Sequence, residues 1–89
     1  MVRKITLVWD DWNVDHIAKH GVSVEEVEAV IDDPKKIVKK HRKRYAVTGS
    51  AFGRILYVIL EKIESERYYV VTARDATTAE KRIYKRKKK

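Results

Sequence analysis

Hydrophobic and polar positions divide the chain into a helical first part and a second part that favours strands. Val27, Val30 and Ile31 recur at helical spacing, with glutamates at the positions between them. From Lys35 onward, short runs of β-branched and aromatic residues alternate with turns. We therefore expect one α+β domain over residues 1–89, with helices packed on an antiparallel meander of strands. The predicted strands are 5–9, 36–40, 44–48, 54–61 and 67–74.

Local signals mark the ends of two N-terminal helices that we expect to form a helical hairpin. Asp10 and Asp11 can cap a helix over 12–19, which Gly21 ends. Ser23 and Glu26 form a capping-box pattern for the second helix, and Pro34 ends it. The expected inner side of the first helix comprises Trp12, Ile17, Val14 and Ala18.

The turns and the last strand follow from the remaining pattern. Residues 49–53 contain two glycines and predict a turn, and 62–66 predict a charged hairpin turn. The run 67–74 is continuously β-branched and aromatic, which predicts a central strand buried on both faces. Thr77 and Glu80 repeat the capping-box pattern, so a last helix begins there and the basic end at 85–89 is expected to fray.

Charge is distributed unevenly along the 89 residues. Residues 1–34 carry three Lys/Arg against eight Asp/Glu, a net of −5, and residues 35–89 carry eighteen against five, a net of +13. A basic second part indicates a polyanionic partner such as nucleic acid, although a lysine-rich coat that keeps the protein soluble gives the same composition. No cysteine is present, which fits a cytoplasmic protein, and the run 5–9 is too short for a signal peptide or a membrane span.

Two histidines have the spacing of a metal site but lack further ligands. His16 and His20 are four residues apart on a predicted helix, where two imidazoles can share a metal. No HExxH glutamate lies between them, and the only other histidine is His41. We therefore expect no metal, with His16 at the surface and His20 at the end of its helix.

Basic residues suggest a phosphate-binding surface. The run 39–44 is either a solvated loop or the rim of such a surface, and repulsion among its cations favours the rim. Arg54, Arg67 and Arg74 lie at strand ends, where each can make a structural salt bridge or join a cleft for a phosphodiester. Glu80 and Tyr84, one turn apart on the last helix, are either structural or part of the same site.

The ordered set of short motifs resembles the BrnT family over about residues 7–84. The N-terminal motif consists of Trp9-Asp10, Asn13, His16, Lys19-His20-Gly21-Val22-Ser23 and Glu25-Glu26-Val27. The second half of the pattern consists of Arg44-Tyr45, Gly49, Gly53-Arg54-Ile55-Leu56-Tyr57-Val58, Thr72-Ala73-Arg74, Ala76-Thr77, Glu80 and Tyr84. The lysine-rich end and the unbroken basic run at 39–44 depart from that pattern.

The resemblance implies a RelE-like fold and a ribonuclease toxin of a type II toxin–antitoxin system, acting without a metal or other cofactor. Its partners would be RNA and a DNA-binding, ribbon-helix-helix antitoxin encoded next door, through which it would oligomerise. Arg74 and Arg54 would hold the phosphate, with Glu80 or His20 as base and Tyr84 or a lysine as acid. RNA and antitoxin would compete for one basic face. The alternative is a binding module of the same fold that cleaves nothing. The expected RNA-binding residues are Lys39, Lys40, His41, Arg42, Lys43 and Arg44.

Overall fold

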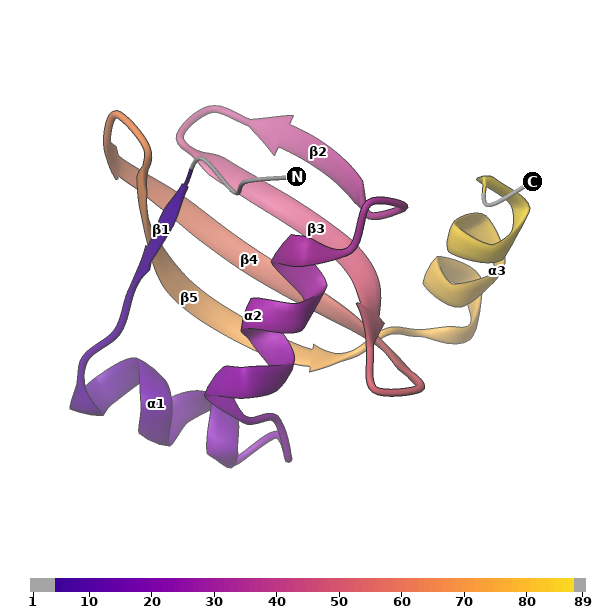
Figure 1. Ribbon diagram of the computed structural model, residues 1–89, viewed down its shortest axis with the longest axis horizontal. Helices are drawn as coiled ribbons and strands as arrows, with labels where there is room; N and C mark the ends of the chain where they lie inside the picture. The colour runs from indigo at the N-terminus through magenta and orange to yellow at the C-terminus, as the bar shows by residue number, and fades with distance from the viewer. Residues whose placement is uncertain (1–4, 88–89) are drawn as a thin grey trace.

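Five strands form a single mixed sheet in the computed structural model, which describes residues 5–87 (Figure 1). Its strand order is β1-β5-β4-β3-β2, with neighbours from β2 to β5 antiparallel and β1 parallel to β5. The expected α+β class is confirmed, but a wholly antiparallel sheet is wrong because β1 runs in the direction of β5. The strands are β1 (Thr6–Val8), β2 (Ile37–His41), β3 (Arg44–Ala51), β4 (Arg54–Glu64) and β5 (Arg67–Asp75). The helices are α1 (Asp11–Ala18), α2 (Val24–Asp32) and α3 (Thr78–Lys87).

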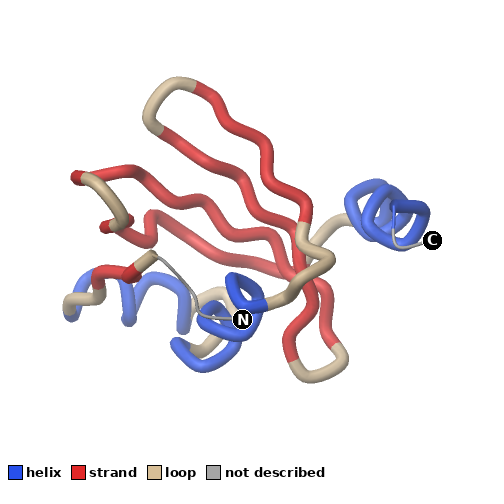
Figure 2. Tube along the Cα trace, turned by 45° about the horizontal axis from the view of Figure 1, so that its top comes forward, coloured by secondary structure: helices blue, strands red, loops and turns tan. Residues whose placement is uncertain are grey.

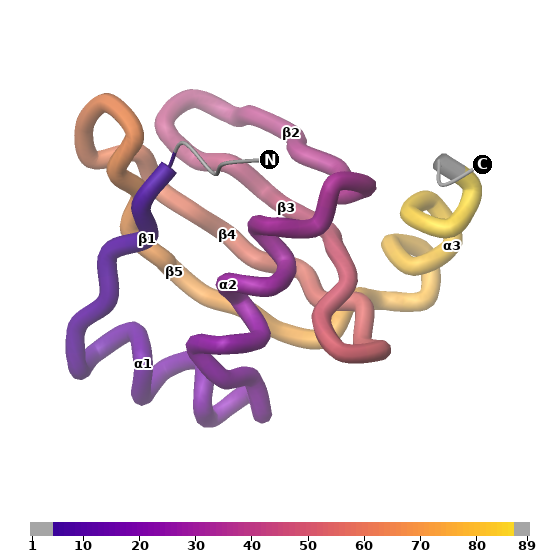
Figure 3. Tube along the Cα trace, in the orientation of Figure 1, coloured from indigo at the N-terminus to yellow at the C-terminus, as the bar shows by residue number. Residues whose placement is uncertain are grey.

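Each of the first two helices packs against the sheet. α2 crosses β3 and β4, whereas α1 lies beside β5 (Figure 3). Because their main contacts are with different strands, they do not form a hairpin packed mainly on itself. The core between α2, α1 and the sheet contains Leu7, Ile17, Val22, Val27, Val30, Ile31, Val47, Ala51, Leu56, Val58, Leu60, Val70 and Ala73.

Capping boxes form at all three helices, as predicted for α2 and α3, whereas the one at α1 was not predicted. Ser23 and Glu26 bond reciprocally at the start of α2, and Thr77 and Glu80 do so at the start of α3. Asp10 pairs in the same way with Asn13 at the start of α1. These contacts span three residues, so they depend on the local sequence.

The inner side of α1 differs from the expectation. Asn13 and Ile17 are buried, while Trp12 is 60% exposed and Val14 is also exposed. Asn13 turns inward because its amide donates to the carbonyls of Val8 and Val70, which joins α1 to β1 and β5. Asn13, whose amide satisfies two backbone carbonyls, therefore occupies the buried side of α1 where we expected the Trp12 side chain.

Strands β3 and β4 are longer than predicted. Gly49 lies inside β3, and the turn falls at Phe52 and Gly53, whose φ angles are 50° and 87°. A Cβ at Gly49 would lie 3.0 Å from Val30 Cγ1, so glycine allows the close packing of α2 on β3. β4 continues to Glu64, which shortens the predicted 62–66 turn.

Strand β5 is buried on one face only, which corrects the expectation of burial on both. The register with β4 skips Val71, so Val70 and Ala73 both point into the core. β5 lies between β1 and β4, although β1 pairs only with its first three residues. Beyond these three residues, α1 lies beside β5, and the Asn13 amide donates to the Val70 carbonyl.

One face of the sheet carries α1 and α2, and α3 lies at the sheet's end (Figure 2). We call the other face the open face. Because side chains alternate along a strand, the neighbours of core residues point to it. Its middle consists of half-buried residues from β4 and β5, namely Ile55, Tyr57, Ile59, Thr72 and Arg74.

Candidate functional site

Arg74 lies on the open face and is held from three directions. Its Nη1 and Nη2 atoms donate to the two Glu80 carboxylate oxygens at 3.0 and 3.1 Å, and Nη1 also donates to the Asp75 carbonyl at 2.9 Å. The guanidinium carbon lies 4.2 Å from the centre of the Tyr57 ring. The guanidinium is therefore fixed in place while the Arg74 side chain stays 38% exposed.

The fixed guanidinium retains hydrogen-bonding capacity. Arginine has five N–H donors, and the contacts above use both donors of Nη1 and one of Nη2. The Nε–H and the second Nη2–H, which share one edge of the group, bond to no described residue. That edge can grip two oxygens of a phosphate.

Glu80 is engaged by Arg74 and by its own helix cap. The bond from Arg74 lowers the pKa of Glu80, the Thr77 backbone N–H lowers it further, and burial opposes both effects. The bond with Glu80 in turn raises the pKa of Arg74. Glu80 is thus a weak base at neutral pH, and its contacts suit it to positioning Arg74.

Arg54 points to the helix-covered face, so the predicted cleft of converging arginines does not form. Its Nη1 donates to Glu26 at 2.7 Å and to the Gly21 carbonyl at 3.0 Å, and its Nη2 donates to Asp75 at 3.0 Å. The bond to Glu26 is the largest cause of its raised pKa. Arg67 makes a local ion pair with Glu64. Through these contacts, Arg54 links α2, β4 and β5.

Tyr84 is inside the protein. It is 3% exposed, and its hydroxyl donates to Asp33 Oδ2 at 2.6 Å. Burial and the bond to Asp33 raise the pKa of Tyr84 to about 12. Since Asp33 also accepts from the Ser50 backbone N–H, Tyr84 fastens α3 to the end of α2 and to β3.

Helix α1 forms a rim along the β5 side of the open face. At the start of α1, Asp10 accepts a hydrogen bond from the Tyr69 hydroxyl of β5. Further along the helix, the His16 Nε2 lies 3.2 Å from the Thr72 Oγ1 of β5. The two elements therefore advance together toward Arg74. His20 continues the row, 5.3 Å from the His16 ring in an edge-on contact, and is exposed.

The basic run is divided between the two faces. Register with β3 and β4 places Lys39, His41 and Arg44 on the open face, where Arg44 pairs with Glu61 at 3.2 Å. Lys40 turns to the other face, with its Nζ 5.7 Å from the centre of the Tyr45 ring. The single basic face expected from the sequence is therefore two surfaces.

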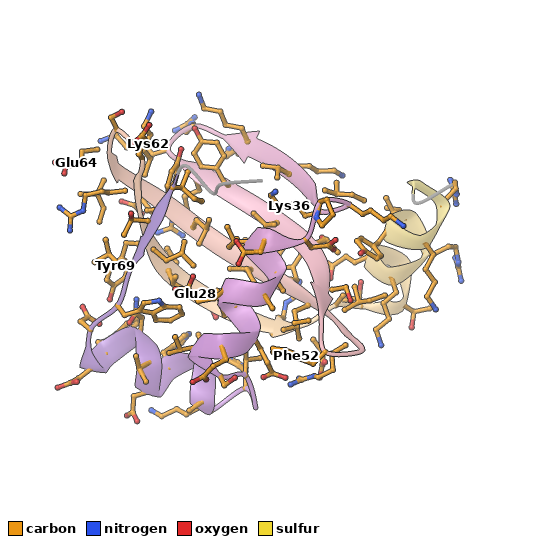
Figure 4. All side chains as sticks on the ribbon, in the orientation of Figure 1. Glu28, Lys36, Phe52, Lys62, Glu64 and Tyr69 are labelled. Atoms are coloured by element: carbon orange, nitrogen blue, oxygen red, sulfur yellow. The ribbon has the colours of Figure 1, made fainter. Side chains whose placement is uncertain are left out.

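The second surface surrounds a shallow cavity of about 260 Å³. In Figure 4, Lys62 and Glu64 mark this end of the sheet, and Phe52 marks the opposite end. Four cations and one carboxylate line the cavity, so it too attracts anions. Its lining residues are Lys40, Arg42, Lys43, Tyr45, Lys62, Ile63 and Glu64.

Within residues 5–87, no group of three or more His, Cys, Asp or Glu side chains is arranged to hold a metal ion. None of the described helices is long and apolar enough to cross a membrane.

Sequence reasoning missed the neighbours of Arg74. Tyr57 and Thr72 read as ordinary strand residues, and His16 is 56 residues from Thr72 in the chain. Within the strand pattern, the available signal was the alternation of Tyr57 with the buried Leu56 and Val58. It marks Tyr57 as facing away from the core without indicating that Arg74 lies opposite it.

Comparisons with known proteins agree with this architecture. The family model described as "Ribonuclease toxin, BrnT, of type II toxin-antitoxin system" matches residues 9–80. The crystal structure of the Brucella abortus ribonuclease toxin BrnT superposes with a TM-score of 0.64 at 25% identity, covering 83% of this chain and 99% of that one. No curated protein matches the chain.

Proposed function

The chain belongs to the BrnT family of ribonuclease toxins of type II toxin–antitoxin systems, and we propose that it cleaves RNA on its open face with Arg74 as the phosphate-binding residue. The observation that carries this assignment is the free edge of the Arg74 guanidinium. Glu80, Tyr57 and the Asp75 carbonyl hold the group rigidly, and two parallel N–H donors remain for a phosphodiester. A donor pair fixed before substrate binds stabilises developing charge most effectively.

RNA supplies its own nucleophile. The 2′-oxygen loses its proton and attacks the adjacent phosphorus, the bond to the 5′-oxygen breaks, and that oxygen takes up a proton. Arg74 stabilises the extra negative charge on the phosphate oxygens as the new bond forms. Of the candidate bases, His20 is the exposed one and lies on the rim that leads toward Arg74, so we assign proton transfer to it.

The experiment is cleavage of a fluorescent RNA oligonucleotide by purified protein. Arg74→Ala should reduce the rate by about 10²–10³, the usual effect of losing one charge-stabilising donor. Arg74→Lys should recover little, because an ammonium cannot bond to Glu80 and a phosphate through separate edges. Undiminished cleavage by Arg74→Ala would refute the assignment.

His20→Gln separates proton transfer from binding. It should lower the maximal rate by about 10²–10⁴, while RNA affinity stays close to that of the wild type. We propose that cleavage needs no metal, so it should persist in a chelator. Loss of activity in the chelator would instead favour a metal held by His16 and His20.

We further propose a RelE-like fold, a cytoplasmic site of action and neutralisation by an antitoxin of the ribbon-helix-helix class, encoded next door, through which the toxin oligomerises. Family membership supports an antitoxin partner and an RNA substrate. Growth arrest on induced expression, relieved by co-expression of the neighbouring gene, is the test. If a cleavage-deficient Arg74→Ala protein arrests growth equally, the fold serves as a binding module instead.

A further inference from the structure

We propose that the Trp12–His16 pair on α1 is a subsite that binds one unpaired nucleobase of the RNA, with a preference for guanine. The proposal rests on the proposed function, because it assumes that RNA occupies the open face. It assigns to α1 a recognition role that is separate from the reaction at Arg74.

The aromatic pair forms a preorganised stacking surface. The Trp12 and His16 rings are parallel within 7°, with centroids 4.9 Å apart. His16 is fixed by its bond to Thr72 and by the edge of His20. Trp12 nevertheless remains 60% exposed, so much of its indole can receive another ring. Stacking on an aromatic side chain is how proteins commonly hold unpaired bases.

The same place offers groups for the edge of the base. A shallow cavity of about 140 Å³ is lined by Trp12, Asp15, His16 and Lys19. Neither the Asp15 carboxylate nor the Lys19 ammonium bonds to another described side chain, so both remain available. Guanine presents two adjacent donors, which a carboxylate can accept together, and beside them the O6 acceptor, which suits an ammonium.

The subsite is continuous with the candidate site. His16 bonds to Thr72, which lies two residues from Arg74 on the same face of β5, about 7 Å along the strand. A strand of RNA held at Arg74 can therefore place a neighbouring base over α1. The acidic residues of α1 disfavour phosphates there, which suits a site for a base rather than for the backbone.

Trp12 fluorescence provides a direct test. In Trp9→Phe protein Trp12 is the sole tryptophan, and its emission is titrated with 2′-O-methyl oligonucleotides, which lack the nucleophile and are not cleaved. An eight-nucleotide uridine oligonucleotide with one central guanine should quench the emission to saturation. The same oligonucleotide with uridine or inosine at that position should bind more weakly, since inosine lacks the 2-amino group.

Variants locate the effect. Trp12→Ala should weaken binding of the guanine oligonucleotide by about 5- to 150-fold, the range measured for stacking one base. Val14→Ala, which removes another exposed apolar side chain from α1 outside the cavity, is the matched control and should bind normally. Asp15→Asn should abolish the preference for guanine while leaving affinity for uridine unchanged. Unfolding midpoints confirm that each variant is folded.

The outcomes separate the two proposals. If RNA is bound and cleaved but Trp12 is not quenched and Trp12→Ala binds normally, the subsite is refuted and the proposed function stands. Equal quenching by all three oligonucleotides refutes the guanine preference. If no RNA is bound or cleaved, the proposed function itself fails.

Discussion

At the residue scale, Arg54 and Arg74 show how two similar side chains acquire different roles. Both lie near the same end of adjacent strands, and both make charge-assisted hydrogen bonds to carboxylates. The contacts of Arg54 join three parts of the backbone, whereas Arg74 keeps an unbonded edge toward the open face. Only the second arrangement suits a ligand.

Arg54→Ala should therefore affect stability rather than catalysis. Loss of the bonds to Glu26, Gly21 and Asp75 should lower the free energy of unfolding by about 1–3 kcal/mol, a modest value because the side chain is one-third exposed. Urea denaturation measures the loss, and cleavage is compared per folded molecule. If Arg54→Ala instead lowers the cleavage rate as much as Arg74→Ala while stability stays unchanged, Arg54 takes part in the reaction.

At the element scale, the packing of α2 on β3 depends on one missing side chain. A Cβ at Gly49 would approach Val30 Cγ1 at 3.0 Å, the Val30 carbonyl at 3.1 Å and Asp33 Oδ2 at 3.3 Å. Gly49→Ala should displace α2 and lower the free energy of unfolding by about 1–3 kcal/mol. Ser50→Ala, on the opposite face of β3, is the control for urea denaturation. Equal stability of the two variants would show that α2 adapts without strain.

Elements were predictable from the sequence where their signals are local. The capping boxes of α2 and α3 act over three residues, and both helices begin where expected. The faces of Arg54 and Arg74 depend instead on the strand register, which shifts twice between β4 and β5. A shift of one residue moves a side chain to the other face, so the sequence could not tell which arginines meet.

At the scale of the whole molecule, the cations belong to two surfaces. Charge reversal at Lys39 and Arg44 on the open face should weaken RNA binding on the order of tenfold or more and reduce the slope of log affinity against log salt by about 1.4. Reversal at Lys40 and Lys43, beside the cavity of the second surface, changes the net charge equally and should have a smaller effect. Fluorescence anisotropy across a salt series distinguishes them. Equal losses would mean that RNA contacts both surfaces or responds to net charge alone.

Acid should weaken the contacts between elements. The Ser23 backbone N–H lowers the pKa of Glu26, and Arg74 lowers that of Glu80. Burial alone would raise the pKa of Asp33, but bonds from the Tyr84 hydroxyl and the Ser50 and Lys35 backbone N–H groups together lower it. Unfolding returns these groups to ordinary values near 4.5 and 3.8, so the unfolded chain binds more protons below them.

The free energy of unfolding should accordingly be constant well above pH 4.5 and fall as the pH drops through the lowered folded values. Urea denaturation at pH 6, 5, 4 and 3 measures the change. Glu80→Gln removes one of the three groups and should flatten the curve. Stability that does not change over this range would contradict the assigned pKa shifts.

Strand β2 ends the sheet on the side opposite β1, and no strand within residues 5–87 pairs with its outer backbone edge. An exposed strand edge can pair with a strand of another chain, including a second copy of the same protein. Here Lys39, Lys40 and His41 make up most of the edge, so two identical edges meet with like charges facing each other. A strand with acidic side chains meets no such barrier. The edge therefore discourages aggregation of the protein with itself while remaining open to a partner of opposite charge.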